Sequence, residues 1–275
     1  MAKLGKDYKG ILGAAIGDIS GSVIEFRPFL KPKMKETAIL FCEGSEFTDD
    51  TVMTAAIADC MANDKNRDFA SSMRKWGREY PNAGYGGHFI QWLFNRNLGP
   101  YNSCGNGSAM RISAVAYFAK TEDEAVGFAR EATAITHDHP EGIKGAVTMT
   151  RLIYKALHGA SKEELHKIAI SQYDFESLDY ETMKAYQGHG QEICQVTVPQ
   201  ALWCFFHSNS FEDCLRIALT IGWDCDTLAD IACALAEAYY KEIPESIVFE
   251  AQARLTKDIK LALESVPTEQ FARAL

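Results

Sequence analysis

The segment Thr48-Asp49-Asp50-Thr51 lies where a loop enters a run of small and apolar residues, 52–62. A second tetrad, Asp224-Cys225-Asp226-Thr227, stands in the same position before residues 228–240. Thr and Asp favour helix N-termini because their oxygens accept bonds from free backbone N–H groups and their charge suits the helix dipole. The two tetrads therefore predict the starts of two helices, and capping alone would account for either tetrad taken singly.

The two tetrads together supply four carboxylates and at least two hydroxyls. If the two helix starts converge, the carboxylates need a cation in order to stay ionised together. All of these donors are hard oxygens, which suit Mg²⁺, and Mn²⁺ after it, better than Zn²⁺. We therefore expect a magnesium site, with manganese as the alternative. A prenyl-synthase DDxxD motif is excluded, because it would need Asp at position 53, where the chain has Met53.

The composition is that of a soluble globular protein. The 275 residues are 47% hydrophobic, which is enough to bury a large core, and no composition break divides residues 1–275 into separate domains. The net charge of −9 leaves no basic surface for nucleic acid or for anionic membranes. Residues 1–7 lack the apolar core of a signal peptide, and no apolar run reaches the roughly 18 residues of a membrane span. The eight cysteines form no CxxC pair, so we expect free thiols and a cytoplasmic location.

Helical spacing recurs along the chain and strand patterns are nearly absent, which predicts an all-α fold. Glycines in segment 7–19 would weaken an isolated helix but would allow a neighbouring element to approach closely. Ser161 to Glu164 has the form of a capping box. Residues 171–196 are expected to form a loop with short helical turns. Besides the two helices above, we expect helices over 7–19, 69–80, 88–94, 110–119, 122–135, 142–158, 197–207, 211–221 and 244–265, and one that begins after Ser161.

Glu25 lies between two apolar residues, Ile24 and Phe26. In a partly apolar cleft its pKa would rise, which would suit a general acid or base. From the residue alone, a solvated loop carboxylate is the simpler interpretation.

A glycine-rich loop precedes another helix and consists of Ser103, Cys104, Gly105, Asn106, Gly107 and Ser108. Such a backbone can direct several N–H groups at a phosphate, although the lysine and the spacing of a P-loop are missing. His137 precedes a helix with Pro140 near its start, so capping or surface exposure is its default role. Tyr85 is by default a packing residue.

Five spaced motifs resemble those of the ADP-ribosylglycohydrolases, the family of dinitrogenase reductase-activating glycohydrolase and the ADP-ribosylhydrolases. The resemblance extends from Gly10 to about Ile247 and implies an all-α orthogonal bundle with two Mg²⁺ ions in a central cleft. The motifs are Gly-Asp-x-x-Gly-x-x-x-Glu (17–25), Thr-Asp-Asp-Thr (48–51), Gly-Asn-Gly-Ser-Ala-Met-Arg (105–111), Thr-His (136–137) and Asp-x-Asp-Thr (224–227).

The resemblance also implies roles for individual residues. Thr48, Asp49 and Asp50 would bind metal from one helix start, and Asp224, Asp226 and Thr227 from the other, with Asp226 bridging. Glu25 would lie near the scissile bond and act in catalysis with Asp49 and Asp50. The loop 103–108 and His137 would hold ADP-ribose, and Tyr85 and Gly86 would border the same cleft. The implied reaction is Mg²⁺-dependent hydrolysis of an ADP-ribosyl–acceptor bond, which releases ADP-ribose.

Two departures from the family pattern affect substrate identity. Relatives usually carry two glycines before the second acidic tetrad, whereas here Gly222 is followed by Trp223, which could contact the substrate. Cys104 stands where some relatives have an aromatic residue. The alternatives are a two-metal phosphohydrolase that acts on a nucleotide, and a non-catalytic, crystallin-like or ADP-ribose-binding member. The acceptor and the oligomeric state are left open.

Overall fold

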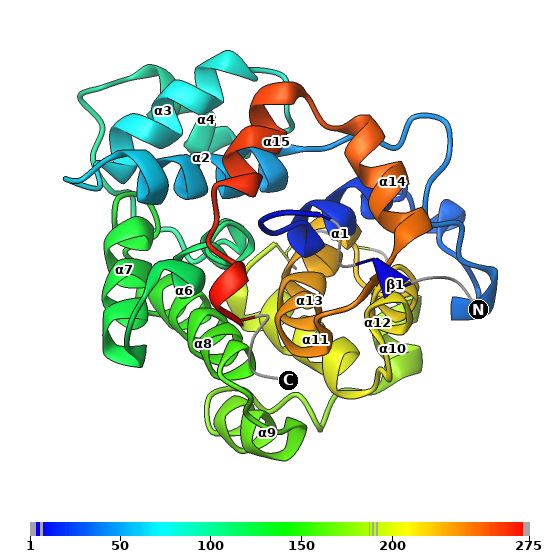
Figure 1. The fold of residues 1–275 in the computed structure, drawn as a ribbon. Helices are drawn as coiled ribbons and strands as arrows, with labels where there is room; N and C mark the ends of the chain where they lie inside the picture. The colour runs from blue at the N-terminus through cyan, green and yellow to red at the C-terminus, as the bar shows by residue number, and fades with distance from the viewer. Residues whose placement is uncertain (1–3, 6–7, 187, 189, 191, 272–275) are drawn as a thin grey trace.

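Helices α1 (Gly13–Gly21) and α13 (Cys225–Tyr240) lie side by side at the centre of the protein (Figure 1). The contact is close because glycines of α1 face α13. A Cβ on Gly17 would lie 2.3 Å from the carbonyl carbon of Ala229, and one on Gly21 would lie 2.4 Å from the Cα of Asp226. The expected close approach is therefore confirmed at Gly17 and extends to Gly21, and it brings the end of α1 against the start of α13.

The computed structural model describes residues 4–5, 8–186, 188, 190 and 192–271. These residues are mainly helical, which confirms the predicted all-α fold. Besides α1 and α13, the α-helices are α2 (Asp49–Asn63), α3 (Phe69–Glu79), α4 (Gly87–Phe94), α5 (Gly107–Met110), α6 (Val115–Phe118), α7 (Glu122–Ala134), α8 (Pro140–Leu157), α9 (Lys162–Ile170), α10 (Tyr180–Ala185), α11 (Cys194–Phe206), α12 (Phe211–Ala218), α14 (Glu245–Arg254) and α15 (Lys257–Glu264).

The remaining regular elements are small. Strand β1 (Leu4–Gly5) pairs antiparallel with β2 (Ile243–Pro244). Short 3-10 helices span Pro28–Leu30 (η1), Lys35–Thr37 (η2) and Glu269–Phe271 (η3). None of the helices formed by the described residues combines the length and the hydrophobicity that a membrane crossing requires.

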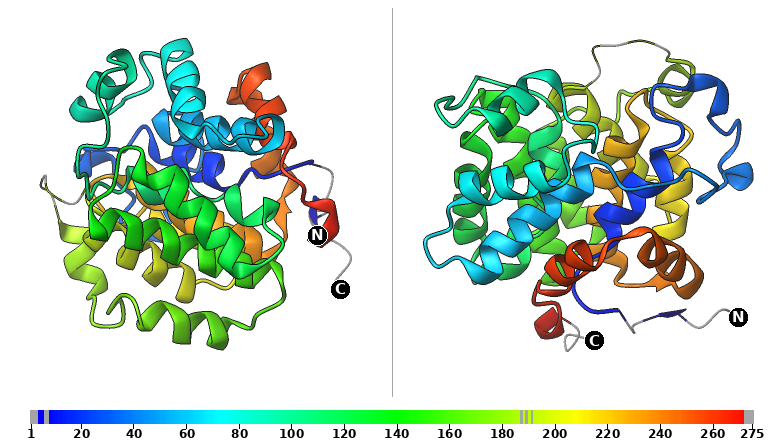
Figure 2. Two further views of the ribbon diagram at one scale, coloured as in Figure 1. Left: turned by 90° about the vertical axis from the view of Figure 1, so that its left-hand side faces the viewer. Right: turned by 90° about the horizontal axis from the view of Figure 1, so that it is seen from above.

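Helix α13 is the core element of the bundle. All of its residues from Cys225 to Ala238 are buried, as expected for a helix that is surrounded by neighbours rather than amphipathic. It packs against α1, α8, α11 and α12, while α2 packs against α3 and α15 on the opposite side of α1 (Figures 1 and 2). The Asp49 end of α2 and the Cys225 end of α13 thereby come to the same region.

A distant carboxylate caps the N-terminus of α1. Glu237, near the end of α13, accepts bonds from the backbone N–H groups of Leu12 and Gly13, both at 2.8 Å, and from the hydroxyl of Tyr8 at 2.7 Å. This arrangement satisfies donors that the first turn of a helix leaves free. It joins α1 to α13 at the end of the pair that lies away from the acidic tetrads.

Several helix bounds differ from those predicted. The 110–119 segment is interrupted by a turn at 111–114, and the 244–265 segment divides at Leu255, after which Thr256 caps α15. Helix α1 begins at Gly13 rather than at residue 7, because Gly10 has a left-handed φ of 73° and packs against the Leu263 carbonyl. Asp7 lies outside the described residues, as do positions 187, 189 and 191 of the expected loop. The capping box at Ser161 and Glu164 is confirmed.

Candidate active site

The starts of α2 and α13 converge, as the two tetrads suggested. Carboxylate oxygens of Asp18, Asp50 and Asp226 lie within 4.8 Å of one another, and so do those of Glu25, Asp224 and Asp226. Asp226 belongs to both groups and links them. The convergence depends on α1 and on the loop that follows it, since these supply Asp18 and Glu25.

Asp18 holds the first tetrad in place. Its Oδ2 accepts bonds from the backbone N–H groups of Thr48 and Thr51, at 2.8 and 3.1 Å, and from the Thr51 hydroxyl. Its Oδ1 accepts from the Thr48 hydroxyl at 2.7 Å. Thr48 also accepts from the N–H of Asp50, and so caps α2. The hydrogen bonds of Asp18 thus order the turn from which Asp49 and Asp50 project.

Asp224 does not cap α13 with its side chain, which was the simplest explanation of the second tetrad. Its carboxylate instead accepts a bond of 2.6 Å from the Nδ2 of Asn106, in the glycine-rich loop. The second tetrad is therefore oriented by residues from another part of the chain. Thr48 is both a cap and part of the acidic site, whereas Asp224 belongs to the site alone.

Burial and mutual repulsion raise the pKa values of these carboxyl groups. Burial, opposed by the hydrogen bonds from Thr48 and Thr51, raises the pKa of Asp18 to about 6. Burial, followed by the charges of Asp224 and Asp18, raises the pKa of Glu25 to about 7. Burial is also the main cause that raises the pKa values of Asp49, Asp50 and Asp226 well above their usual range.

The donor set fits divalent cations. The clustered groups are carboxylates and threonine hydroxyls, the hard oxygen donors that Mg²⁺ and Mn²⁺ prefer. Oδ1 of Asp50 is buried and finds no hydrogen-bond partner among the described residues. A buried carboxylate oxygen without a donor is expected where a cation completes its surroundings.

A cavity of about 320 Å³ opens over the acidic cluster. This volume lies at the lower end of the range found for small-molecule binding sites. Glu25, Asp49, Asp50, Asp224 and Thr227 form its acidic side. The other lining residues are Phe26, Gly84, Gly86, Gly87, His88, Phe89, Tyr101, Ser103, Gly105, Asn106, Gly107, Met110, Arg111, His137 and Glu192.

The wall of the cavity around α5 carries positive rather than negative charge. Arg111 is 1% exposed, and burial lowers its pKa only to about 10, so it stays charged at neutral pH. It donates to the Thr136 hydroxyl at 2.7 Å, and among the described residues no carboxylate lies within ion-pair distance of it. Burial, together with the charge of Arg111, lowers the pKa of His137 well below its usual range, which keeps this ring neutral. The cavity thus has an acidic side and a cationic side.

Not all of the residues expected to contact substrate line this cavity. Ser103, Gly105, Asn106, Gly107 and His137 do. The other four, Tyr85, Cys104, Ser108 and Trp223, are not among its lining residues.

Each of these four residues has a structural contact. Tyr85 is buried with its ring against Phe89, at 5.7 Å between centroids. The Ser108 hydroxyl donates to the Gly142 carbonyl at 2.9 Å, which anchors the loop to α8. The Cys104 carbonyl accepts from Cys194, and the Trp223 carbonyl accepts from Phe26, each at 2.9 Å.

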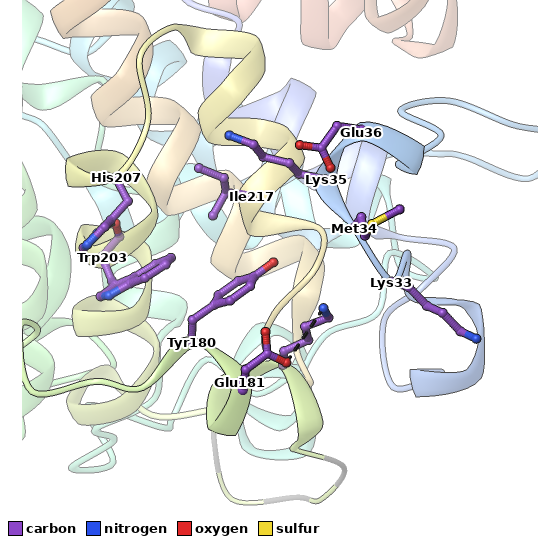
Figure 3. A pocket seen from close by; sticks show the side chains of 10 residues that line it. Lys33, Met34, Lys35, Glu36, Tyr180, Glu181, Trp203, His207 and Ile217 are labelled. Atoms are coloured by element: carbon purple, nitrogen blue, oxygen red, sulfur yellow. Dashed lines mark hydrogen bonds and ion pairs between the residues drawn. The ribbon is translucent and has the colours of Figure 1, made fainter.

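A second cavity, of about 400 Å³, lies between the 33–36 segment and helices α10, α11 and α12 (Figure 3). Tyr180 and Trp203 stack at its wall, with centroids 5.3 Å apart, and the ring of His207 lies 3.9 Å from that of Trp203. The chain's own side chains therefore occupy these aromatic faces. This cavity contains none of the clustered carboxylates, so the candidate active site is the first cavity.

The comparisons with known proteins agree with the geometry. The family model for ADP-ribosylglycohydrolase matches residues 5–271. The chain therefore belongs to the ADP-ribosylglycohydrolase family, and the family resemblance of its five motifs is confirmed. It is a hydrolase of glycosidic bonds that link ADP-ribose.

Among curated relatives, ADP-ribosylhydrolase ARH3 of Bos taurus is 26% identical over 318 residues, covering 87% of each chain. ADP-ribosylarginine hydrolase Tri1 of Pseudomonas putida (strain GB-1) is 26% identical over 84% of this chain and 69% of its own. ADP-ribosyl-[dinitrogen reductase] glycohydrolase of Rhodospirillum rubrum is 23% identical over 93% of each chain. A solved structure titled ADP-ribosylglycohydrolase-related protein complex superposes with a TM-score of 0.71 at 24% identity, over 93% of this chain and 94% of that one, and so shares the fold.

Proposed function

We propose that the protein removes ADP-ribose from a modified acceptor by Mg²⁺-dependent hydrolysis of the bond at the distal ribose. The observation that carries this proposal is the two-sided cavity. Clustered carboxylates at one side suit metal ions and sugar hydroxyls, and the buried guanidinium of Arg111 at the other suits a pyrophosphate. ADP-ribose carries both kinds of group in one molecule.

The metal-binding set that we propose is Thr48, Asp49, Asp50, Asp224, Asp226 and Thr227, with Asp226 shared between two ions. Asp226 occupies both carboxylate triads, which supports the shared role. The chemistry that bound Mg²⁺ supplies at such a site is polarisation of hydroxyls and activation of water. Mn²⁺ has similar ligand preferences and is the expected substitute.

Glu25 is the residue that we assign to proton transfer. A carboxyl group with a pKa of about 7 is available in either protonation state at neutral pH, which is the condition for efficient general acid–base catalysis. It lines the cavity, and its carboxylate lies beside those of Asp224 and Asp226 at the acidic cluster. Glu25 would thereby assist bond cleavage through an oxocarbenium-like state.

Arg111 explains how a chain of net charge −9 can bind a doubly charged pyrophosphate. A buried guanidinium interacts strongly with phosphate oxygens and can bind them in a bidentate manner. The neutral ring of His137 and the backbone of Gly105 and Gly107 line the same wall. The buried charge of Arg111 therefore takes the role that a basic surface has in other phosphate-binding proteins.

The eight free cysteines support action in a reducing compartment, for which we propose the cytoplasm.

A hydrolysis panel tests the proposal. ADP-ribose linked to arginine, to serine, to a nucleic-acid end and to a small metabolite would each be incubated with Mg²⁺, Mn²⁺ or EDTA, and released ADP-ribose and phosphate would be quantified by chromatography. We expect ADP-ribose release from at least one substrate with either metal, none in EDTA, and no phosphate.

The matched variant is Asp49→Asn combined with Asp50→Asn, which keeps side-chain shape but removes two charges. It should lose both turnover and Mg²⁺ binding. Unchanged turnover and affinity in this variant would contradict the metal-dependent mechanism. Phosphate release without ADP-ribose would instead support a two-metal phosphohydrolase, and binding of ADP-ribose without any turnover would support a non-catalytic member.

A further inference from the structure

Asp230 is an acidic residue of α13 to which the proposed mechanism gives no role. It follows Asp226 by one helical turn, so the two side chains project from the same face of α13. Its backbone lies against α1, since a Cβ on Gly17 would be 2.4 Å from the Asp230 nitrogen. Asp18 follows Gly17 directly, so Asp230 lies at the level of Asp18, one turn beyond Asp226 and away from the start of α13.

The Asp230 side chain is fully buried, at 0% exposure. Within the described part of the chain, neither of its carboxylate oxygens has a hydrogen-bond partner. An isolated buried carboxylate is strongly unfavourable unless a donor or a cation satisfies it. Glu237, two turns further along α13, is also a buried acid but has three donors. Among the buried carboxylates that the structure describes, Asp230 is the one in which both oxygens lack a partner.

The groups that act on Asp230 belong to the candidate active site. Burial, followed by the charges of Asp18 and Asp49, raises the pKa of Asp230, and burial, followed by the charges of Asp18 and Asp230, raises that of Asp50. Oδ1 of Asp50 is likewise buried without a partner among the described residues. Asp230 is in neither carboxylate triad, but it lies one turn from Asp226, and its unpartnered oxygens and that of Asp50 belong to residues whose charges act on each other.

We propose that Asp230 is an additional cation-binding residue, which together with Asp50 holds a divalent ion at the floor of the acidic cluster. The inference rests on the proposed Mg²⁺ dependence of this enzyme and extends its ligand set beyond the two tetrads. The cation would satisfy the unpartnered oxygens of Asp230, and the carboxylate of Asp230 would add negative charge beside the cation. It would make the site bind divalent cations more tightly than the tetrads do alone.

The test is cation binding by Asp230→Asn, which keeps the side-chain shape. Isothermal titration with MnCl₂ and the electron paramagnetic resonance of free Mn²⁺ give affinity and stoichiometry, independently of turnover. We expect affinity to fall by about tenfold or more, the size of effect seen when groups that support metal ligands are removed. The unfolding midpoint in EDTA should rise, because the substitution removes a carboxyl group whose ionisation burial disfavours.

Glu237→Gln is the matched control, since it neutralises another buried acid on the same helix. It should leave Mn²⁺ affinity unchanged and lower the unfolding midpoint, which is the opposite of the result expected for Asp230→Asn. Asp230→Ala provides a second measurement of affinity if the Asn variant folds poorly. If a folded Asp230 variant kept the Mn²⁺ affinity of the wild-type protein, the role of Asp230 would be overturned but the metal-dependent function would not. No Mn²⁺ or Mg²⁺ binding by the wild-type protein would overturn the metal-dependent function as well.

Discussion

Asp18 and Thr51 are joined by two hydrogen bonds to the same carboxylate oxygen, one from the Thr51 backbone at 3.1 Å and one from its hydroxyl at 2.5 Å. The two residues are 33 positions apart in the chain, and the contact fixes the first turn of α2 on the end of α1. The geometry of the acidic site therefore depends on a residue whose own oxygens are already satisfied within the protein.

Replacing Asp18 with Ala should disorganise this turn. The N–H groups and hydroxyls of Thr48 and Thr51 would lose their acceptor, and each buried unpaired group costs about 1–3 kcal/mol. We expect a loss of about 2–4 kcal/mol in the free energy of unfolding, with weaker Mg²⁺ binding. Urea unfolding and isothermal titration measure the two effects. Asp18→Asn, which keeps one acceptor oxygen, should lose less stability, and equal stability of Asp18→Ala and wild type would contradict this role.

Replacing Glu25 with Gln should remove the general acid–base group without removing side-chain volume. We expect turnover to fall by about 10²–10⁴-fold, which is the usual contribution of such a group. The wild-type rate should also change through a pH transition that belongs to Glu25, and bound Mg²⁺ should move this transition below the pKa of about 7 that burial gives Glu25 without metal. A pH–rate profile checks both statements. If the variant kept that transition, Glu25 would not be the titrating group.

Replacing Arg111 with Met should weaken binding of ADP-ribose. Hydrogen bonds to charged groups contribute about 1.5–3 kcal/mol, which corresponds to an affinity loss of about 10- to 100-fold. Calorimetry with ADP-ribose in saturating Mg²⁺ measures the change, and Mg²⁺ affinity should stay the same. Arg151→Met, at a surface arginine that pairs with Glu122, is the control and should bind as wild type does. Wild-type ADP-ribose affinity of Arg111→Met would remove Arg111 from the binding site.

In EDTA, the protein should lose stability as the pH rises from about 4 to about 7. The pKa of Asp18 is raised from 3.8 to about 6 and that of Glu25 from 4.5 to about 7, mainly by burial. Between these values the folded protein binds more protons than the unfolded chain, so the free energy of unfolding falls with increasing pH. Thermal unfolding across this range tests the sign. Saturating Mg²⁺ should flatten the profile at its neutral end, since the ion stabilises the ionised carboxylates.

Alanine at Gly17 and alanine at Gly127 should change stability in opposite directions. A Cβ at Gly17 would lie 2.3 Å from the α13 backbone, so α1 must move, at a cost of about 1–3 kcal/mol or more. Gly127, in α7, has no atom within 4 Å of the added Cβ, so alanine there should add about 0.5–1 kcal/mol. Chemical denaturation of both variants measures the contrast. Equal effects at the two sites would mean that the α1–α13 contact is not tightly packed.

The all-α fold was predictable because helical periodicity and capping residues are local properties. Ser161 with Glu164 is a case in which the local pattern sufficed. The break at Leu255 was missed because residues on both sides of it have helical spacing, and only the Thr256 cap marks the second start. The turn at 111–114 within the predicted 110–119 helix is hidden in the same way, since the residues on both sides of it are helical.

The two tetrads predicted two helix starts, and the family resemblance implied that they meet in one cleft, but the supporting residues were not predictable. Whether Asp18 faces a metal or Thr51 depends on how α1 packs against α2. A local sequence pattern does not determine this packing. Ser108 and Cys104 belong to the expected loop, yet their contacts are with Gly142 and Cys194, outside it. Arg111 ends the motif Gly-Asn-Gly-Ser-Ala-Met-Arg. Its position between the apolar residues Met110 and Ile112 is the sequence feature that indicates its burial.

The packing of α1 against α13 also has a consequence for synthesis. The two segments that form the acidic site are separated by about 170 residues of chain between Thr51 and Asp224. A ribosome must therefore complete most of the polypeptide before α13 can emerge and α1 can find its partner. Until then the glycine face of α1 lacks the helix against which it packs, although Asp18 can already bind Thr48 and Thr51. Assembly of the site is accordingly a late step of folding, and nascent chains that stop before α13 contain only one of its two halves.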